Sequence, residues 1–246
     1  MVLLLGTSAD NQQKTLDKDM LGGGRPSLFC FGRSMSTKLE KKQLLKSDII
    51  TAANIYKEKL AGKVFLYVYG REYFELNFAT AQFLHLTGVA TNLRAREFYR
   101  RAKDSTLALN QFYFCEGHPF ATAKRKLQCL KNLPSLTTEL VCVLKGLNTL
   151  TFTYKIGVTN LQFTLGLTEN VDSNGKKIND WLVPRTLRPK DNSIAKSNDG
   201  EFVDFILSKP ASNKKYDMIC YQEAGKKFPP ELIYMVDTCT GLDRSI

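Results

Sequence analysis

The stretch Phe83-Leu84-His85-Leu86-Thr87-Gly88-Val89 lies at the junction between two differently patterned parts of the chain. Before it, apolar and polar residues alternate as in a β-hairpin, and after it comes the most basic helical segment of the sequence. His85 is one of only two histidines in 246 residues. Imidazole is the one side chain whose unperturbed pKa lies near neutrality, so His85 is a candidate proton-transfer group. A core histidine with both nitrogens satisfied is the alternative.

The composition indicates a soluble, cytoplasmic globular protein with a polyanionic partner. Hydrophobic residues make up 43% and charged residues 24%, as in ordinary globular domains, but the formal net charge is +11. This excess favours nucleic acid ahead of a membrane surface as the partner. Six cysteines at wide, irregular spacings, with no CxxC pair, predict reduced thiols and no structural zinc. The apolar runs are too short to span a membrane, so no membrane partner is expected.

Residue usage divides the chain into three expected parts. Residues 1–34 are expected to be a non-native or disordered extension, because the GGGRP run at 22–26 breaks any element and no apolar period surrounds it. Met35-Ser36-Thr37-Lys38 looks like a natural start. Residues 35–228 are expected to form a single domain, and residues 229–246, which begin with a Pro-Pro pair, a C-terminal tail.

The order of the predicted elements indicates the fold class. Helices are expected at 47–60, at 92–103 and from Pro119 to just before Pro134. Extended segments are expected at 64–69, 74–78, 83–86, 140–144, 150–156, 161–167, 181–183, 202–207 and 216–221. Pro184 cannot donate a hydrogen bond, so its strand is expected to end there or to lie at a sheet edge. Helices and a hairpin followed by a meander predict an α+β fold with N-terminal helices packed on a mostly antiparallel sheet.

Positive charge is concentrated between residues 94 and 131, where nine basic side chains accompany only three acidic ones. A phosphate-contacting surface is one interpretation, because neutralising phosphates is what drives proteins onto nucleic acid. Its candidate nucleic-acid-binding residues are Arg94, Arg100, Arg101, Lys124 and Arg125. Two solvated amphipathic helices are the alternative, since Glu97 and Arg101 have the i,i+4 spacing of an ion pair.

A second basic cluster occupies residues 184–190, with the sequence Pro-Arg-Thr-Leu-Arg-Pro-Lys. Its two guanidiniums and one hydroxyl suit the holding of a phosphate and the stabilisation of charge on a phosphorane. An ordinary exposed strand exit is the alternative. His118 precedes Pro119 at a predicted helix start, where histidine is usually a capping or surface residue, so a functional role is the less favoured interpretation.

The absence of known catalytic motifs restricts the possible reaction mechanisms further. The sequence contains no clear P-loop, HExxH, GxSxG or EF-hand loop, and no acidic cluster suited to magnesium. A nuclease with this sequence is therefore expected to use no metal and no cofactor. It would depend on histidine, on lysine or arginine, and on hydroxyl groups for proton transfer and charge stabilisation.

Residues from about 48 to 221 resemble the phage-associated members of the barnase/EndoU/colicin/RelE-like nuclease superfamily, in the branch marked by FLHLTG. The matching segments are 49–60, 65–69, 83–89, 97–99, 126–127 with 133–134, 165–167 and 183–186. The resemblance implies N-terminal helices before an antiparallel sheet, and a metal-independent RNase activity. It also implies a source in phages and integrative elements.

The resemblance also assigns roles to individual residues. His85 would be the acid–base group, and Thr87 and Thr186 would position it or the phosphate. The groups that would neutralise charge are Arg185, Arg188 and Lys155. The leading hypothesis is thus a phage- or mobile-element-encoded endoribonuclease that cleaves the RNA phosphodiester, with RNA and a cognate inhibitor or host protein as partners.

A catalytically inactive phage accessory protein, which binds nucleic acid or protein to block a host defence, is the alternative function. The two hypotheses differ in geometry. An enzyme requires His85 exposed in a cleft, with Thr186, Arg188 or Lys155 near enough to share one phosphate, whereas a binder requires only a basic surface.

Overall fold

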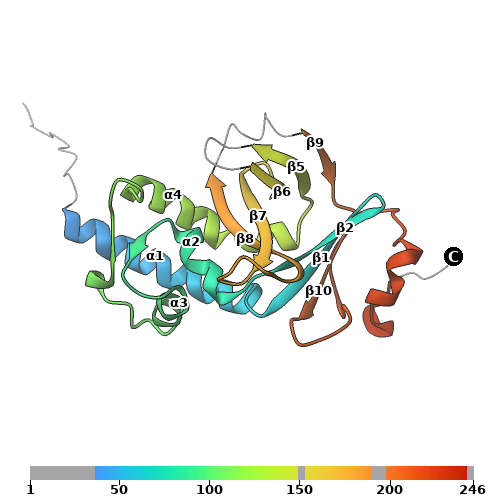
Figure 1. Cartoon of the computed structure of the whole chain (residues 1–246), viewed down its shortest axis with the longest axis horizontal. Helices are drawn as coiled ribbons and strands as arrows, with labels where there is room; N and C mark the ends of the chain where they lie inside the picture. Colours follow the sequence, from blue (N-terminus) through green and yellow to red (C-terminus); the bar gives the residue numbers. More distant parts are fainter. Residues whose placement is uncertain (1–36, 149–152, 190–197, 243–246) are drawn as a thin grey trace, which may run out of the picture. The chain divides into compact units, whose positions relative to one another are not determined.

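The computed structural model describes residues 37–148, 153–189 and 198–242 (Figure 1). The α-helices are α1 (Lys38–Lys59), α2 (Phe83–Thr87), α3 (Ala95–Lys103) and α4 (Phe120–Lys131). Short 3-10 helices are η1 (Thr80–Gln82), η2 (Leu109–Gln111), η3 (Leu133–Thr137), η5 (Pro230–Met235) and η6 (Thr238–Thr240). The strands are β1 (Lys63–Tyr69), β2 (Glu72–Asn77), β3 (Ala90–Thr91), β4 (Phe112–Tyr113), β5 (Cys142–Asn148), β6 (Thr153–Thr159), β7 (Phe163–Val171), β8 (Lys177–Pro189), β9 (Asn198–Phe202), β10 (Phe205–Pro210) and β11 (Met218–Gln222). The predicted extension at 1–34 lies outside the described residues.

The start of α1 differs from the prediction, which placed it at residue 47. Thr37 caps the helix instead: its hydroxyl accepts from the Glu40 amide at 3.2 Å, while the Glu40 carboxylate accepts from the Thr37 amide at 2.8 Å. This reciprocal capping box satisfies two amides that a helix start would otherwise leave to water. The first turns have no apolar face for the sequence to reveal, because Leu39 and Leu44 are at least half exposed.

Residues 83–86 were predicted to be extended, and this prediction is wrong. They form α2, a single helical turn that ends at Gly88 with a left-handed φ of +73°. Phe83 and Leu86, three residues apart, are both fully buried, whereas His85 between them is exposed. Burial therefore follows the spacing of a helix rather than the alternation of a strand.

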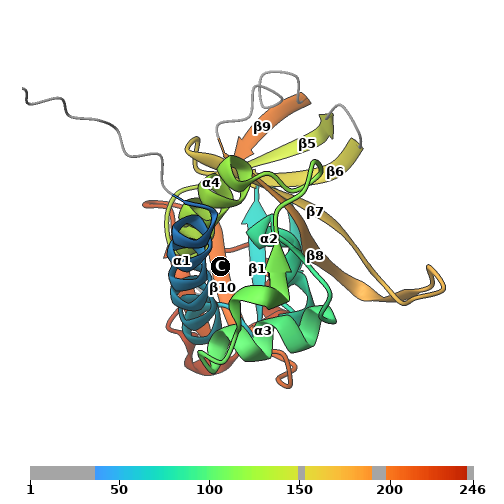
Figure 2. The same cartoon turned by 90° about the vertical axis from the view of Figure 1, so that its left-hand side faces the viewer.

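The described strands other than β3 and β4 form a nine-stranded sheet of order β11-β10-β1-β2-β8-β7-β6-β5-β9. Its pairs are antiparallel except for β2 with β8. The sheet curls, as Figures 1 and 2 show. Residues 202–207, predicted as one strand, are divided between β9 and β10 because the chain crosses over at Val203 and Asp204. Their amides donate to the Val141 carbonyl at 3.0 Å and the Val68 carbonyl at 2.8 Å, respectively.

Strand β8 was expected at an edge, or to stop at Pro184, and it does neither. It lies between β2 and β7, and it runs through the proline. Pairing with β7 shifts register here: Pro184 lies opposite Leu167 and Thr186 opposite Gly166, so Arg185 is the extra residue of a bulge. A bulge tolerates the missing proline donor and turns the neighbouring side chain out of the regular alternation. Arg185 is exposed as a result.

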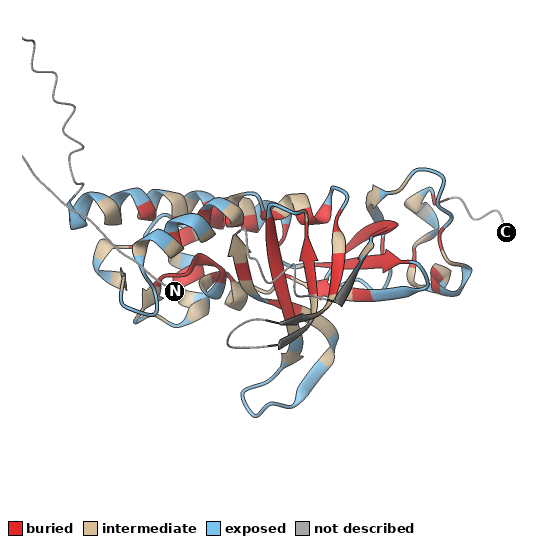
Figure 3. Ribbon diagram, turned by 90° about the horizontal axis from the view of Figure 1, so that it is seen from above, coloured by how far each residue is buried: buried red, intermediate tan, exposed pale blue. Residues whose placement is uncertain are grey.

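Strand β1 separates two hydrophobic cores, because both of its faces are buried (Figure 3). Phe65 and Tyr67 belong to a cluster that also contains buried residues of α1, α3 and α4. Val64 and Leu66, which alternate with them, belong to a second cluster. This second cluster is completed by Tyr216, Phe228, Leu232, Val236 and Leu242. Residues 229–242, which were expected to be a tail, thus contribute to the core of the domain.

Candidate active site

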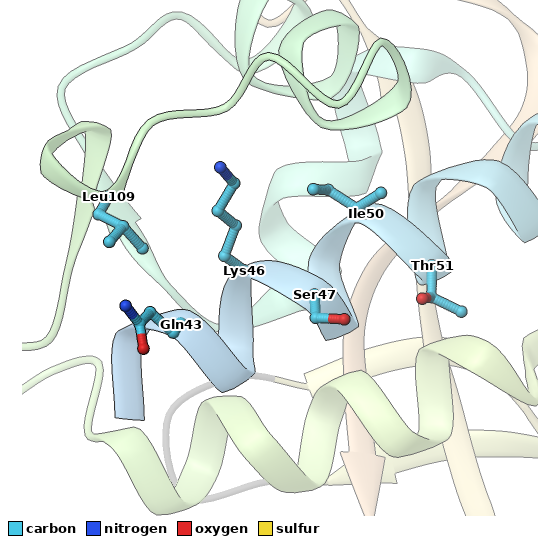
Figure 4. A pocket seen from close by; sticks show the side chains of 6 residues that line it. All are labelled: Gln43, Lys46, Ser47, Ile50, Thr51 and Leu109. Atoms are coloured by element: carbon cyan, nitrogen blue, oxygen red, sulfur yellow. The ribbon is translucent and has the colours of Figure 1, made fainter. Parts of the chain in front are cut away.

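A cavity of about 470 Å³ lies between α2, the β3–β4 pair, the turn at 115–118 and α4. Both histidines of the chain, His85 and His118, line it together with Lys126. A second hollow, of about 410 Å³, is formed by α1 residues such as Gln43, Lys46 and Ser47 with Leu109 (Figure 4). None of the sequence-predicted site residues lines that second hollow, so the first cavity is the candidate site.

His85 reaches the cavity because α2 is anchored by the buried Phe83 and Leu86 and presents the histidine on its outer side. The surrounding protein lowers the pKa of His85, first because it removes water from the ring. The positive charges of Arg185, Lys126 and His118, in that order, lower this pKa further, because they disfavour the imidazolium form. The lowered pKa favours the neutral form of His85.

His118 is presented to the cavity by a tight turn in which Cys115 and His118 exchange backbone hydrogen bonds of 3.3 and 2.9 Å. Its Nδ1 lies 3.1 Å from the carbonyl oxygen of Gly88. A carbonyl only accepts, so Nδ1 must donate, and Nε2 is left as the nitrogen available for proton transfer. The same hydrogen bond fixes the plane of the ring.

Gly88 positions two of the cavity's side chains. A Cβ atom at this residue would lie 2.8 Å from Cδ of Lys126, so the missing side chain is what lets the lysine stem pass. The left-handed φ of +73° also favours glycine, because other L-residues are strained there. The carbonyl of Gly88 accepts the hydrogen bond from His118, and the absence of a side chain at Gly88 leaves space for Lys126. Gly88 therefore helps to position both side chains.

Lys126 projects from α4 and carries a lowered pKa. Burial is the main cause, and the positive charge of Arg188 on β8 is the second. Lys126 lines the cavity, whereas Arg185 and Arg188 lie outside its lining but near enough to lower the pKa of His85 and of Lys126, respectively. These three side chains are named the cavity cations below. Two of the three come from β8, roughly a hundred residues after His85 in the chain, and the fold brings them beside the helical residues.

The remaining predicted catalytic residues are placed differently. Thr87 is fully buried, and its hydroxyl donates to the Leu84 carbonyl at 2.7 Å and accepts from the Val89 amide at 3.4 Å. It does not line the cavity and instead braces the end of α2. Thr186 is half-buried on β8, next to the bulge. Lys155 lies in β6, but its side chain falls outside the described residues.

The predicted nucleic-acid-binding residues of α3 do not line the cavity. Arg100 and Arg101 both bind Glu97, with N–O distances of 2.7 and 2.6 Å. Their hydrogen bonds lower the pKa of Glu97 to about 2. Arg94 is exposed at the N-cap of α3, and Lys124 and Arg125 are exposed on α4, outside the cavity lining.

His118 and Lys126 line the cavity but were not among the site residues predicted from the sequence, where a functional role for His118 was the less favoured interpretation. His118 resembled a capping residue, and Lys126 was one member of a basic run. The pattern Cys-Glu-Gly-His-Pro at 115–119 indicated a turn before a helix, but the partner of the histidine is a glycine carbonyl thirty residues earlier. No local pattern contains that contact.

A family model described as phage-Barnase-EndoU-ColicinE5/D-RelE like nuclease4 matches residues 48–225, which is more than half of the chain. The match confirms the superfamily suggested by FLHLTG. Its range includes His85, His118 and the three cavity cations. Searches of curated proteins and of solved structures find no match.

Proposed function

Because the chain belongs to this phage-Barnase-EndoU-ColicinE5/D-RelE like nuclease family, we propose that it is an endoribonuclease that cleaves RNA without a metal ion. The observation that carries the proposal is a cavity lined by both histidines and Lys126, with Arg185 and Arg188 near enough for positive charge to depress the pKa of His85 and of Lys126. A phosphate group bound there would reverse the electrostatic part of both shifts. Mutually repelling cations attract a phosphodiester and oppose a divalent metal ion.

His85 and His118 divide the proton transfers between them in this proposal. Neutral His85 takes the proton of the ribose 2′-hydroxyl as its oxygen attacks the neighbouring phosphorus. The bond from phosphorus to the 5′-oxygen then breaks, and protonated His118 gives that oxygen a proton from Nε2. The products are a 2′,3′-cyclic phosphate and a 5′-hydroxyl.

The assignment of base and acid follows from the surroundings of each ring. A lowered pKa keeps His85 ready to accept a proton at neutral pH. The Gly88 carbonyl accepts from Nδ1 of His118, which leaves Nε2 as the proton-bearing nitrogen that faces the substrate when the ring is protonated. The cavity cations stabilise the charge that develops on the phosphorane, the largest effect that preorganised charges offer.

Other sequence-based expectations belong to the same proposal. The Thr186 hydroxyl orients the phosphate, Thr87 positions His85 by bracing α2, and Lys155 adds positive charge. The helices pack on the sheet as in the nuclease superfamily, which the cluster shared by α1, α3, α4 and the strands supports. The proposal also includes an origin in a phage or mobile element and action in the cytoplasm. It further includes a cognate inhibitor or host protein as a partner. None of the described helices combines the length and the apolar character that a membrane span requires.

The decisive experiment incubates purified protein with total RNA in EDTA. Wild type is expected to release fragments with 2′,3′-cyclic phosphate ends, and His85→Ala to release none while it keeps its fold and RNA affinity. Lys124→Ala is a matched control, because this lysine lies on α4 outside the cavity lining. Cleavage that EDTA abolishes, or that His85→Ala retains, contradicts the proposal. RNA binding without cleavage by wild type would favour the inactive accessory protein.

A further inference from the structure

The cavity also contains an exposed aromatic ring, which the mechanism above does not use. Tyr113 is 45% exposed and lines the cavity beside both histidines. Its neighbours Phe112 and Phe114 point the other way: Phe112 is fully buried, and Phe114 packs edge-on against Phe112 and Phe120. Strand alternation therefore directs two rings into the core and the third into the cavity.

Tyr113 is fixed on a short structural unit rather than on a loose loop. Strand β4 pairs with β3, so that Tyr113 lies opposite Ala90 and Phe112 opposite Thr91. The Thr91 hydroxyl donates to the Gln111 carbonyl at 2.5 Å and braces the same pair. A few residues later the chain makes the turn that presents His118. The ring and the proton-transferring histidine thus stand on one segment.

An exposed aromatic ring next to a phosphate-handling centre suits a nucleobase. Every base has a π-face, and unpaired bases bind proteins by stacking on tyrosine, phenylalanine or tryptophan. The cavity volume of about 470 Å³ lies in the range of small-ligand sites, so a nucleoside can enter it together with its phosphate.

We propose that Tyr113 is the stacking platform of a nucleobase subsite, and that the substrate is therefore unpaired RNA. The inference rests on the proposed function for the position of the scissile phosphate. A base inside an A-form duplex is stacked on its neighbours and paired, so it cannot lie on Tyr113 without leaving the helix. Single-stranded loops, bulges and ends satisfy the site directly.

The test is a double-mutant cycle between the protein and the RNA. The ligand is a short oligonucleotide with a single ribose that defines the scissile site, used with or without an abasic residue on either side of it. Cleavage is followed as kcat/KM. Binding is followed as Kd by fluorescence anisotropy, with a 2′-O-methyl group that blocks cleavage. The proteins are wild type, Tyr113→Phe, Tyr113→Leu and Tyr113→Ala, with Phe202→Ala as an exposed aromatic control on β9.

Tyr113→Ala and Tyr113→Leu are expected to weaken Kd and kcat/KM by about 5- to 150-fold, the range of one base stacked on an aromatic ring. Tyr113→Phe and Phe202→Ala should stay within about twofold, which also shows that the ring rather than the hydroxyl is used. Removal of the base should weaken Kd and kcat/KM of the wild type by the same factor as Tyr113→Ala does. In the Tyr113→Ala variant, removal of the base should weaken neither quantity further.

Three results would overturn the inference: Tyr113→Ala binds and cleaves as wild type does, the losses from base removal and from Tyr113→Ala add fully, or wild type cleaves the duplexed oligonucleotide as fast as the single strand. A failure of the proposed function is distinguishable from these. If the proposed function is wrong, neither the wild type nor any variant cleaves the oligonucleotide. A Kd that still depends on Tyr113 and on the base then supports the base subsite.

Discussion

Two regions of this protein carry similar numbers of basic side chains and hold them in opposite ways. On α3, Arg100 and Arg101 lie against Glu97, and Lys103 lies 2.7 Å from Asp104. At the cavity, Lys126 lies near Arg188, and His85 near Arg185, with a lowered pKa for Lys126 and His85. Carboxylates accept hydrogen bonds from the cations of the first region, whereas in the second region neighbouring positive charges lower the pKa of His85 and of Lys126.

The difference shows why charge density along a sequence does not locate an anion site. A cation already bound to a carboxylate gains little from a phosphate, because the ion pair must be given up or screened. Cations and imidazoles held close to one another repel, and a bound phosphate relieves that repulsion. The region where like charges are held together is therefore the one expected to bind and process RNA.

The largest effect is expected when one of the two proton-transferring histidines of the cavity is removed. His85→Ala and His118→Ala should each lower kcat on RNA by about 10²- to 10⁴-fold, the usual contribution of a general acid or base. A uridine 3′-phosphodiester with a nitrophenolate leaving group separates the two roles, because this leaving group needs no proton. His118→Ala should recover most of its rate on it, and His85→Ala should not. Equal rescue of both variants would contradict the assignment of base and acid.

The next largest effect is expected when Lys126 loses its charge in a substitution that preserves helix α4. Lys126→Met should lower kcat/KM by about 10²- to 10³-fold, the usual cost of one preorganised charge at a transition state. Lys124→Met, two residues earlier on the exposed face of α4, should change kcat/KM by less than about twofold. Steady-state kinetics on one RNA oligonucleotide compare the two. Similar losses would show that the net charge of α4, rather than the cavity, determines activity.

A smaller effect is expected when the support of the cavity is altered. Gly88→Ala places a Cβ against Cδ of Lys126 and forces an L-residue into a left-handed φ. Stability should fall by about 1–2 kcal/mol from the backbone strain, and cleavage about tenfold from the displaced lysine. Urea unfolding and kinetics measure these separately. The matched control is Gly62→Ala, which shares the left-handed φ (+76°) but whose added Cβ meets nothing within 4 Å, so that stability should fall without the loss of cleavage.

The lowered pKa of His85 predicts a proton linkage. Because the folded pKa lies below the unfolded value, the stability contribution of His85 is fully present above about pH 6.5 and is lost as the pH falls through the folded pKa. Inorganic phosphate should raise the pKa of His85 and so be bound with proton uptake. Calorimetry in two buffers of different ionisation enthalpy measures the uptake. Uptake that persists unchanged in a variant carrying both His85→Ala and His118→Ala would refute the linkage.

The smallest effect is expected on α3. Charge reversal at Arg100 and Arg101 should slow RNA association by less than about tenfold at low salt, because these side chains act by long-range attraction. At 0.5 M salt the difference should disappear, since screening removes that attraction. Stopped-flow association at several salt concentrations provides the measurement. A large decrease in the association rate that does not depend on salt would mean that α3 contacts RNA directly. The proposed difference between the two regions would then be wrong.

The folded elements that the sequence predicted well are those with a local signal. The β1–β2 hairpin lies where extended segments were predicted at 64–69 and 74–78, and α4 lies between Pro119 and Pro134 as predicted. The turn of α2, the crossover between β9 and β10, and the central place of β8 depend on partners far along the chain. Their local patterns were compatible with other structures, so sequence reasoning chose the wrong ones.

The sequence by itself determined the family, through FLHLTG and the order of the weaker segments, and it singled out His85 and the basic segment at 184–190. Only the tertiary structure decided which charges act together. The Gly88 carbonyl positions His118, and the absence of a side chain at Gly88 leaves space for Lys126. Arg185, exposed at a bulge on β8, lies near enough to lower the pKa of His85. The physical reason is that propensity and periodicity act over a few residues, whereas hydrogen bonds and charge repulsion act between whichever groups folding brings together.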